Sequence, residues 1–140
     1  MPLVRKALLL VTPFGLPSDW IATPLVGAPR AGLSAATLLD GRVLVAGGTN
    51  STGDLASPIT GVVPAGSMSA ARRNHLAFLL PHNAQVLVIG GTSAGTALSS
   101  AELCCPWTGA FIATGSLAAV RSDATGSQLS LDGLLLVAVE

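Results

Sequence analysis

The chain has 140 residues, the length of one ordinary domain. Half of its residues are hydrophobic and only 10% are charged, against roughly 25% charged residues in an average soluble domain. Seven basic side chains balance seven acidic ones, so no net field would attract nucleic acid or an anionic membrane. The apolar runs at 7–11, 76–80 and 134–139 are far shorter than the roughly 18 residues that a membrane-spanning helix needs. Sixteen Gly and nine Pro predict many turns, and together these features favour an all-β protein.

The amino-terminal residues resemble a weak secretory signal. Arg5 and Lys6 precede the apolar run 7–11, but Thr12 and Pro13 end that run at five residues, below the 7–15 of a usual signal. We therefore expect no signal peptide and interpret the segment as a β-strand. The compartment stays undetermined.

Several short motifs recur along the chain at intervals of 43 to 49 residues. The pairs at this interval are Gly47-Gly48 with Gly90-Gly91, Gly66-Ser-Met with Gly115-Ser-Leu, and Arg72 with Arg121. Trp20-Ile-Ala-Thr and Phe111-Ile-Ala-Thr are 91 residues apart, and each begins ten residues before an arginine, Arg30 or Arg121. The order and spacing of these landmarks agree. The sequence therefore indicates an internal repeat.

Each repeat contains room for four short strands. In the best-preserved repeat we expect them at 75–80, 85–89, 101–105 and 111–114. The second strands of the three repeats, at 42–46, 85–89 and 134–138, are aliphatic runs, interrupted only by the first residues of the first two, Arg42 and Gln85. Such runs predict strands with both faces buried, as in radially stacked sheets. Tight turns are predicted before these strands, at Asp40-Gly41, Asn83-Ala84 and Asp132-Gly133.

The combined pattern resembles the kelch repeat in its bacterial, galactose-oxidase-like form, over about residues 20–138. The resemblance rests on the Gly-Gly strand ends, Ala101-Glu-Leu, Thr108-Gly-Ala-Phe, Gly115-Ser-Leu and Arg121. It implies four-stranded antiparallel blades of a β-propeller. The expected organisation is an N-terminal segment with an outer strand (1–29), a shortened first unit (30–71), a second unit (72–120) and a partial third (121–140).

The number of units predicts an incomplete propeller. Closed propellers usually have four to eight blades, whereas this chain holds about two and a half. We therefore expect either a fragment that is completed by further kelch units or a subunit that associates with itself.

Candidate binding residues gather in the loops. Segments 49–57, 65–73, 92–100 and 114–123 are expected at one end of the fold, where loops on a rigid scaffold usually bind. The candidates are Arg72, Arg73, Asn74, His75, Thr92, Ser93 and Arg121, and the structural motif is Gly47, Gly48, Gly90 and Gly91. Arginine offers a planar fork of donors for a carboxylate or carbonyl, although an arginine that recurs in each repeat also suits packing.

No residue pattern predicts an enzyme. The chain has no tyrosine, so it cannot house the tyrosine-dependent copper chemistry of galactose oxidase. The two histidines, His75 and His82, lie at opposite ends of one predicted strand and cannot share a metal. The adjacent Cys104 and Cys105 lack metal-ligand spacing and are expected on opposite faces of a strand. No nucleophile, phosphate-loop or zinc motif is present.

We therefore expect no catalytic residues, metal or cofactor. The sequence favours a non-enzymatic binding or scaffold module for a protein or a glycan. The alternative is a fragment of a carbohydrate-active propeller enzyme, galactose-oxidase-like or sugar-epimerase-like, with its catalytic residues outside this chain.

Overall fold

The computed structural model describes residues 6–10, 20–24, 30–57, 59–60, 63–64, 66–128 and 135–138. All regular structure in these residues is β, and every strand pairing is antiparallel. The prediction of an all-β protein is confirmed. No helix in this part of the chain is long and apolar enough to cross a membrane.

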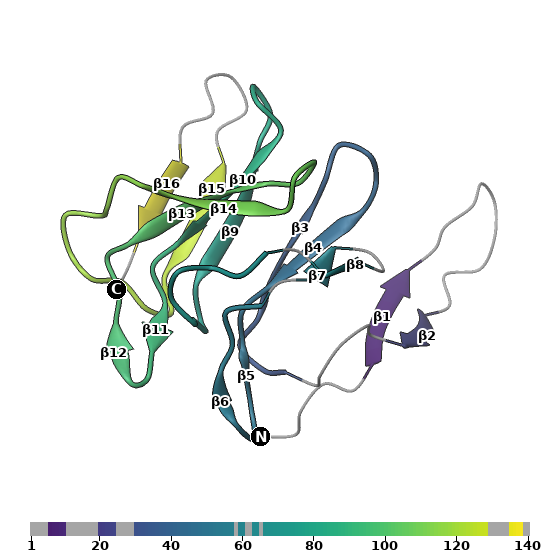
Figure 1. The fold of residues 1–140 in the computed structure, drawn as a ribbon, viewed down its shortest axis with the longest axis horizontal. Coiled ribbons are helices and arrows are strands. Elements are labelled where there is room, and N and C mark those ends of the chain that lie inside the picture. Colours follow the sequence, from purple (N-terminus) through teal and green to yellow (C-terminus); the bar gives the residue numbers. More distant parts are fainter. Residues whose placement is uncertain are drawn as a thin grey trace.

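Two four-stranded sheets form the centre of the structure (Figure 1). The first sheet has the order β3 (Ser34–Thr37), β4 (Val43–Ala46), β7 (Ile59–Thr60) and β8 (Val63–Pro64). The second sheet has the order β9 (Leu76–Leu80), β10 (Gln85–Ile89), β13 (Ala101–Cys105) and β14 (Ala110–Thr114). Each sheet therefore follows the chain as a simple up-and-down series of strands.

Within the described residues, four two-stranded pieces accompany these sheets. Two of them are loop hairpins, β5 (Thr49–Asn50) with β6 (Gly53–Asp54) and β11 (Thr92–Ser93) with β12 (Thr96–Ala97). The other two are β1 (Lys6–Leu10) with β2 (Trp20–Pro24), and β15 (Thr125–Gln128) with β16 (Leu135–Ala138). The expectation of a strand near the amino terminus is confirmed by β1.

The predicted strands of the second sheet agree closely with the structure. The expected segments 85–89 and 101–105 are β10 and β13, and β9 and β14 each begin within one residue of the expected start. The predicted turn before β4 is also present, because Gly41 has a φ of 84° and the Asp40 carboxylate accepts a hydrogen bond from the Arg42 amide at 3.0 Å. At the matching place before β10, Ala84 has a φ of 57°.

The hydrophobic core lies between the two sheets. Its buried residues are Ala36, Leu38, Leu44, Ala46, Met68, Val86, Val88 and Cys104. The expectation that both faces of the 42–46 strand are buried is wrong, because Val43 is 37% exposed while Leu44 is 1% exposed. Alternate residues of a strand point to opposite faces, and only the Leu44 face of β4 contributes to the core.

The two sheets stack front to back. Leu44 of β4 corresponds to Leu87 of β10 in the repeat, yet the β10 residues in the core are Val86 and Val88. Equivalent strands therefore meet through opposite faces. Such a contact can be repeated indefinitely or closed into a ring, because it leaves one face of each sheet available for a further sheet.

Candidate binding site at the loop end

The diglycines join each sheet to the following repeat. The Gly48 amide donates to the Arg72 carbonyl at 2.8 Å, and the Gly91 amide donates to the Arg121 carbonyl at 2.6 Å. Gly47 and Gly90 have φ angles of 61° and 67°, which glycine adopts without steric cost. A Cβ at Gly90 would lie 2.7 Å from the Arg121 carbonyl oxygen. Glycine is therefore required here both by the backbone conformation and by the close approach of the next repeat.

The side chain of Arg72 is fully buried beneath this junction. Its Nη1 donates to the carbonyl oxygens of Gly90 (3.0 Å) and Ser100 (3.1 Å). Its Nη2 donates to Ser100 Oγ at 3.1 Å and to the Glu102 carboxylate at 2.9 Å. The other oxygen of Glu102 accepts the Ser69 amide at 2.8 Å. Burial lowers the pKa of Arg72, and the negative charge of Glu102 opposes this shift. The buried ion pair connects the loop that contains Ser69 and Arg72 to strand β13, which contains Glu102.

Arg30 occupies the same place one repeat earlier. Its Nη1 donates to the carbonyl oxygens of Gly47 (3.1 Å) and Ser57 (2.7 Å), which match those of Gly90 and Ser100. Arg30 is 3% exposed, and burial lowers its pKa. The side chains of Arg30 and Arg72 therefore donate to carbonyl oxygens at matching places next to strand ends, which agrees with the packing role considered for the recurring arginines from the sequence.

A second recurring contact links the loops of successive repeats. The Asn74 amide donates to the Gly32 carbonyl at 2.9 Å, and the Asp123 amide donates to the Asn74 carbonyl at 3.2 Å. All three residues have positive φ, at 63° for Gly32, 53° for Asn74 and 54° for Asp123. Asn and Asp are the side chains that best tolerate this conformation after glycine. Asn74 therefore contributes to the junction between repeats through its main-chain N–H and carbonyl groups.

His75 is buried where the two sheets meet. Its Nε2 lies 2.6 Å from Ser34 Oγ, and no partner for its Nδ1 occurs in the part of the chain that the structure describes. Burial, aided by the positive charge of Arg72, lowers the pKa of His75 to about 4. Its imidazole is therefore neutral at pH 7. The described residues contain no group of three or more His, Cys, Asp or Glu side chains that could hold a metal ion.

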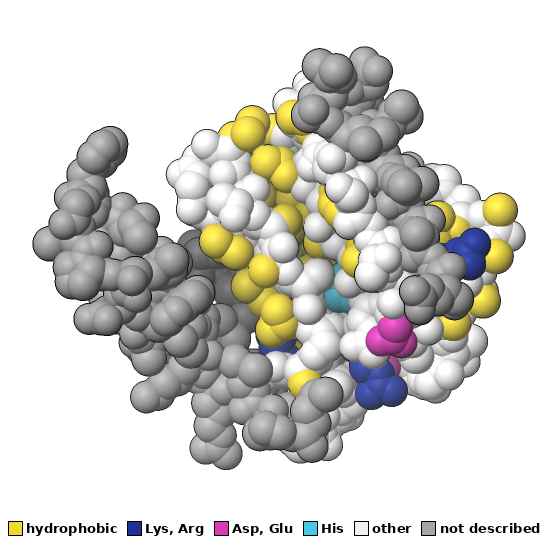
Figure 2. All heavy atoms as spheres, turned by 180° about the vertical axis from the view of Figure 1, so that it is seen from behind, with side chains coloured by type: hydrophobic (Ala, Val, Ile, Leu, Met, Phe, Trp, Pro, Cys, Tyr) yellow, Lys and Arg dark blue, Asp and Glu magenta, His cyan; other side chains and the backbone are white. Residues whose placement is uncertain are grey.

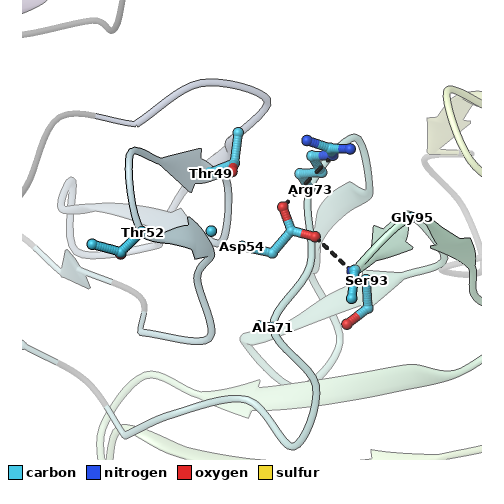
Figure 3. Close-up of a pocket in the computed structure, with 9 residues that line it drawn as sticks. Thr49, Thr52, Asp54, Ala71, Arg73, Ser93 and Gly95 are labelled. Carbon is cyan, nitrogen blue, oxygen red and sulfur yellow. Dashed lines mark hydrogen bonds and ion pairs between the residues drawn. The ribbon is translucent and has the colours of Figure 1, made fainter.

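The β5–β6 and β11–β12 hairpins lie at the same end of the two sheets, which we call the loop end. A shallow pocket of about 470 Å³ opens there, between the two hairpins (Figure 3). The residues that line it are Thr49, Thr52, Gly53, Asp54, Ala71, Arg73, Ser93, Ala94 and Gly95. They come from three of the four segments that the sequence placed at one end of the fold. The prediction that segments 49–57, 65–73 and 92–100 share an end is therefore confirmed.

Asp54 connects the two sides of this pocket. Its Oδ2 accepts a hydrogen bond from the Ala94 amide at 2.8 Å, and its Oδ1 lies 3.6 Å from Arg73 Nε. Figure 3 shows the carboxylate between the β5–β6 hairpin, on which it lies, and the β11–β12 hairpin. The Asp54 side chain is 8% exposed and that of Arg73 is 39% exposed. The guanidinium can therefore meet a ligand while the carboxylate holds it in place.

Only two of the predicted binding residues line the pocket, namely Arg73 and Ser93. Thr92 lies beside them and exchanges backbone hydrogen bonds with Arg73 at 3.0 and 2.8 Å. Arg72, Asn74, His75 and Arg121 belong to the junctions between repeats. Sequence reasoning missed Asp54, although it is the sole charged side chain in the loops 49–57 and 92–100. A single charged residue in otherwise uncharged loops is the sequence signal that points to Asp54.

The cysteines take no part in this site. Cys104 and Cys105 are free and buried on opposite faces of β13, as the sequence predicts. Cys105 Sγ accepts a hydrogen bond from Gln85 at 3.1 Å. Burial raises the pKa of the Cys104 thiol to about 11, which keeps it protonated and unreactive.

Comparisons with known proteins add no relative. No protein-family model matches the chain, and a search of curated proteins finds no match. The function is therefore inferred from the contacts and chemistry of the loop end itself.

Proposed function

We propose that this chain is a non-enzymatic binding module built on part of a kelch-type β-propeller. Its loop end binds a neutral polar group of a protein or a glycan. The observation that carries the proposal is the pocket itself, which is formed jointly by the loops of two successive repeats. Loops held on a rigid β scaffold are common binding sites.

The propeller arrangement is supported by the recurrence of contacts from one repeat to the next. The junction bonds of Gly48 with Arg72 and of Gly91 with Arg121 occupy matching places, and so do those of Leu55 with Gly48 and of Leu98 with Gly91. Front-to-back stacking of equivalent sheets is what a radial array requires. A scaffold of this kind presents the same loops at the same end in each unit.

The chemistry of the pocket favours neutral polar ligands. Arg73 offers N–H donors, and the hydroxyls of Thr49, Thr52 and Ser93 can both donate and accept. The pocket is shallow, and Asp54 is already paired with the guanidinium that would otherwise attract an anion. Peptide amides and sugar hydroxyls therefore fit better than phosphates. Carboxylate-based hydrolysis uses a pair of carboxylates, whereas Asp54 is the single carboxylate among the lining residues.

The proposal is tested with arrays of neutral oligosaccharides and of unstructured peptides, probed with the labelled full chain. We expect one class to bind, and binding to weaken at least tenfold in Asp54→Ala and measurably in Ser93→Ala. The matched control is Asp40→Ala, since Asp40 forms the exposed pair with Arg42 at the turn before β4. Binding to neither array, or equal loss of binding in the control, contradicts the proposal.

A further inference from the structure

The two outermost pieces of sheet each leave one edge unpaired in the residues that the structure describes. Strand β1 pairs only with β2, and β16 pairs only with β15. Figure 1 draws β1 and β2 on the right of the two four-stranded sheets and β15 and β16 on the left, where they overlap the second sheet in this view. An apolar strand with a free edge is a template for pairing with another chain.

The β15–β16 piece has the register of the first two strands of the second sheet. Thr125 faces Ala138 and Gln128 faces Leu135. Each of these residues lies 49 positions after its counterpart in β9 and β10, where Leu76 faces Ile89 and Leu79 faces Val86. The free edge of β16 is therefore the edge by which β10 pairs with β13.

The β1–β2 piece has the register of the last two strands of the second sheet. Leu10 faces Trp20 and Ala7 faces Thr23, just as Cys104 faces Phe111 and Ala101 faces Thr114. The recurrence of Trp20-Ile-Ala-Thr as Phe111-Ile-Ala-Thr supports the same alignment. The free edge of β1 is therefore the edge by which β13 pairs with β10, and the two pieces are complementary halves of one sheet.

We propose that β16 of one copy pairs antiparallel with β1 of a second copy and so completes a four-stranded sheet of the order β2-β1-β16-β15. This inference deepens the proposed propeller assembly and rests on it. The pairing of β10 with β13 sets the register. The expected pairs are Leu135 with Leu10, Leu136 with Leu9, Val137 with Leu8, and Ala138 with Ala7.

Geometry favours a second copy over closure within one chain. Joining β1 to β16 of the same chain would close a ring of three sheets, whereas closed propellers usually need at least four. Two copies contribute two complete sheets each, and their two junctions add two more. The resulting ring of six lies within the usual four to eight. The assembly is therefore a closed dimer.

The association is tested first by mass. Light scattering after size exclusion of the full chain is expected to show twice the 13.9 kDa of one chain. Leu136→Lys places a charge on the pairing strand and is expected to give a monomer, while Leu39→Lys alters a side chain that is already 67% exposed and keeps the dimer. A monomeric unsubstituted chain overturns the inference.

The register is tested by disulfide formation between two singly substituted copies. A mixture of Leu9→Cys with Leu136→Cys is expected to form the crosslinked heterodimer, because directly opposite residues have Cα atoms about 4.5–5.5 Å apart. A mixture of Leu10→Cys with Ala138→Cys is the matched control, with partners three positions out of register. Absence of the first crosslink, or equal crosslinking in the control, overturns the proposed pairing.

The same preparations separate this inference from the proposed function. Asp54→Ala is expected to lose the ligand and keep the dimer mass. A monomer that still binds through Asp54 would overturn the strand pairing and leave the binding function standing. A dimer that forms the expected crosslink but binds no ligand would overturn the binding function and leave the strand pairing standing.

Discussion

Replacing Arg72 by methionine tests how loop and sheet are held together. The Arg72 side chain is 0% exposed and donates four hydrogen bonds, one of them to a Glu102 carboxylate that is itself 2% exposed. Methionine retains an unbranched apolar stem but donates nothing. Removing one partner of a buried ion pair costs about 3–5 kcal/mol, because the other charge stays buried without its partner. Domains are stable by only about 5–15 kcal/mol, so we expect a severely weakened fold.

Urea unfolding followed by the circular dichroism of the sheets measures this effect. We expect a lower midpoint with an unchanged m-value, and a Tm lower by about 10 °C, since each kcal/mol shifts Tm by about 2–4 °C at this chain length. Arg42→Met is the matched control. Arg42 pairs with Asp40 in solvent, with side chains 45% and 50% exposed, and exposed pairs contribute about 0–1 kcal/mol.

Two results would refute the reasoning. A cost below about 1 kcal/mol for Arg72→Met would mean that the buried bonds contribute no more than exposed ones. The second test repeats the substitution in a Glu102→Gln background, where no carboxylate is left unpaired, and there we expect a smaller cost. An unchanged cost would show that the two side chains are not coupled.

Three further predictions concern single positions. Gly90→Ala is expected to cost at least about 2 kcal/mol in urea unfolding, because of a φ of 67° and a backbone oxygen 2.7 Å from the new Cβ, whereas Gly115→Ala meets nothing within 4 Å and stays near neutral. Because the pKa of His75 falls from 6.5 to about 4 on folding, the unfolded state binds more protons between these values. We therefore expect stability to fall by up to about 3 kcal/mol as pH drops from 6.5 to 4, an effect that His75→Gln removes and His82→Gln retains. Ala84→Gly is expected to raise the free energy of unfolding by about 0.5–1 kcal/mol, and with it the melting temperature, because glycine adopts the φ of 57° without steric strain. A lower melting temperature would contradict this.

The sequence by itself predicted the strands and turns of the second sheet to within one residue. It could do so because these features depend on neighbours along the chain. A continuous aliphatic run such as 86–89 favours a buried strand. In the first sheet, Asp40-Gly41 likewise favours a turn, because glycine adopts positive φ freely. The repeat added a second reading of each element, which is why weak signals such as Asn83-Ala84 could still be placed.

Only the tertiary structure decided which polar side chains are buried and which form the pocket. Asp54 meets Ala94 across 40 positions, and His75 meets Ser34 across 41. Arg72 and Arg73 are adjacent in sequence, yet Arg72 is fully buried and Arg73 lines the pocket. Contacts of this range are set by how one sheet stacks on the next, and that stacking depends on side-chain packing summed over whole strand faces. Local backbone preferences determine the strands but carry no information about which face of one strand meets which face of another.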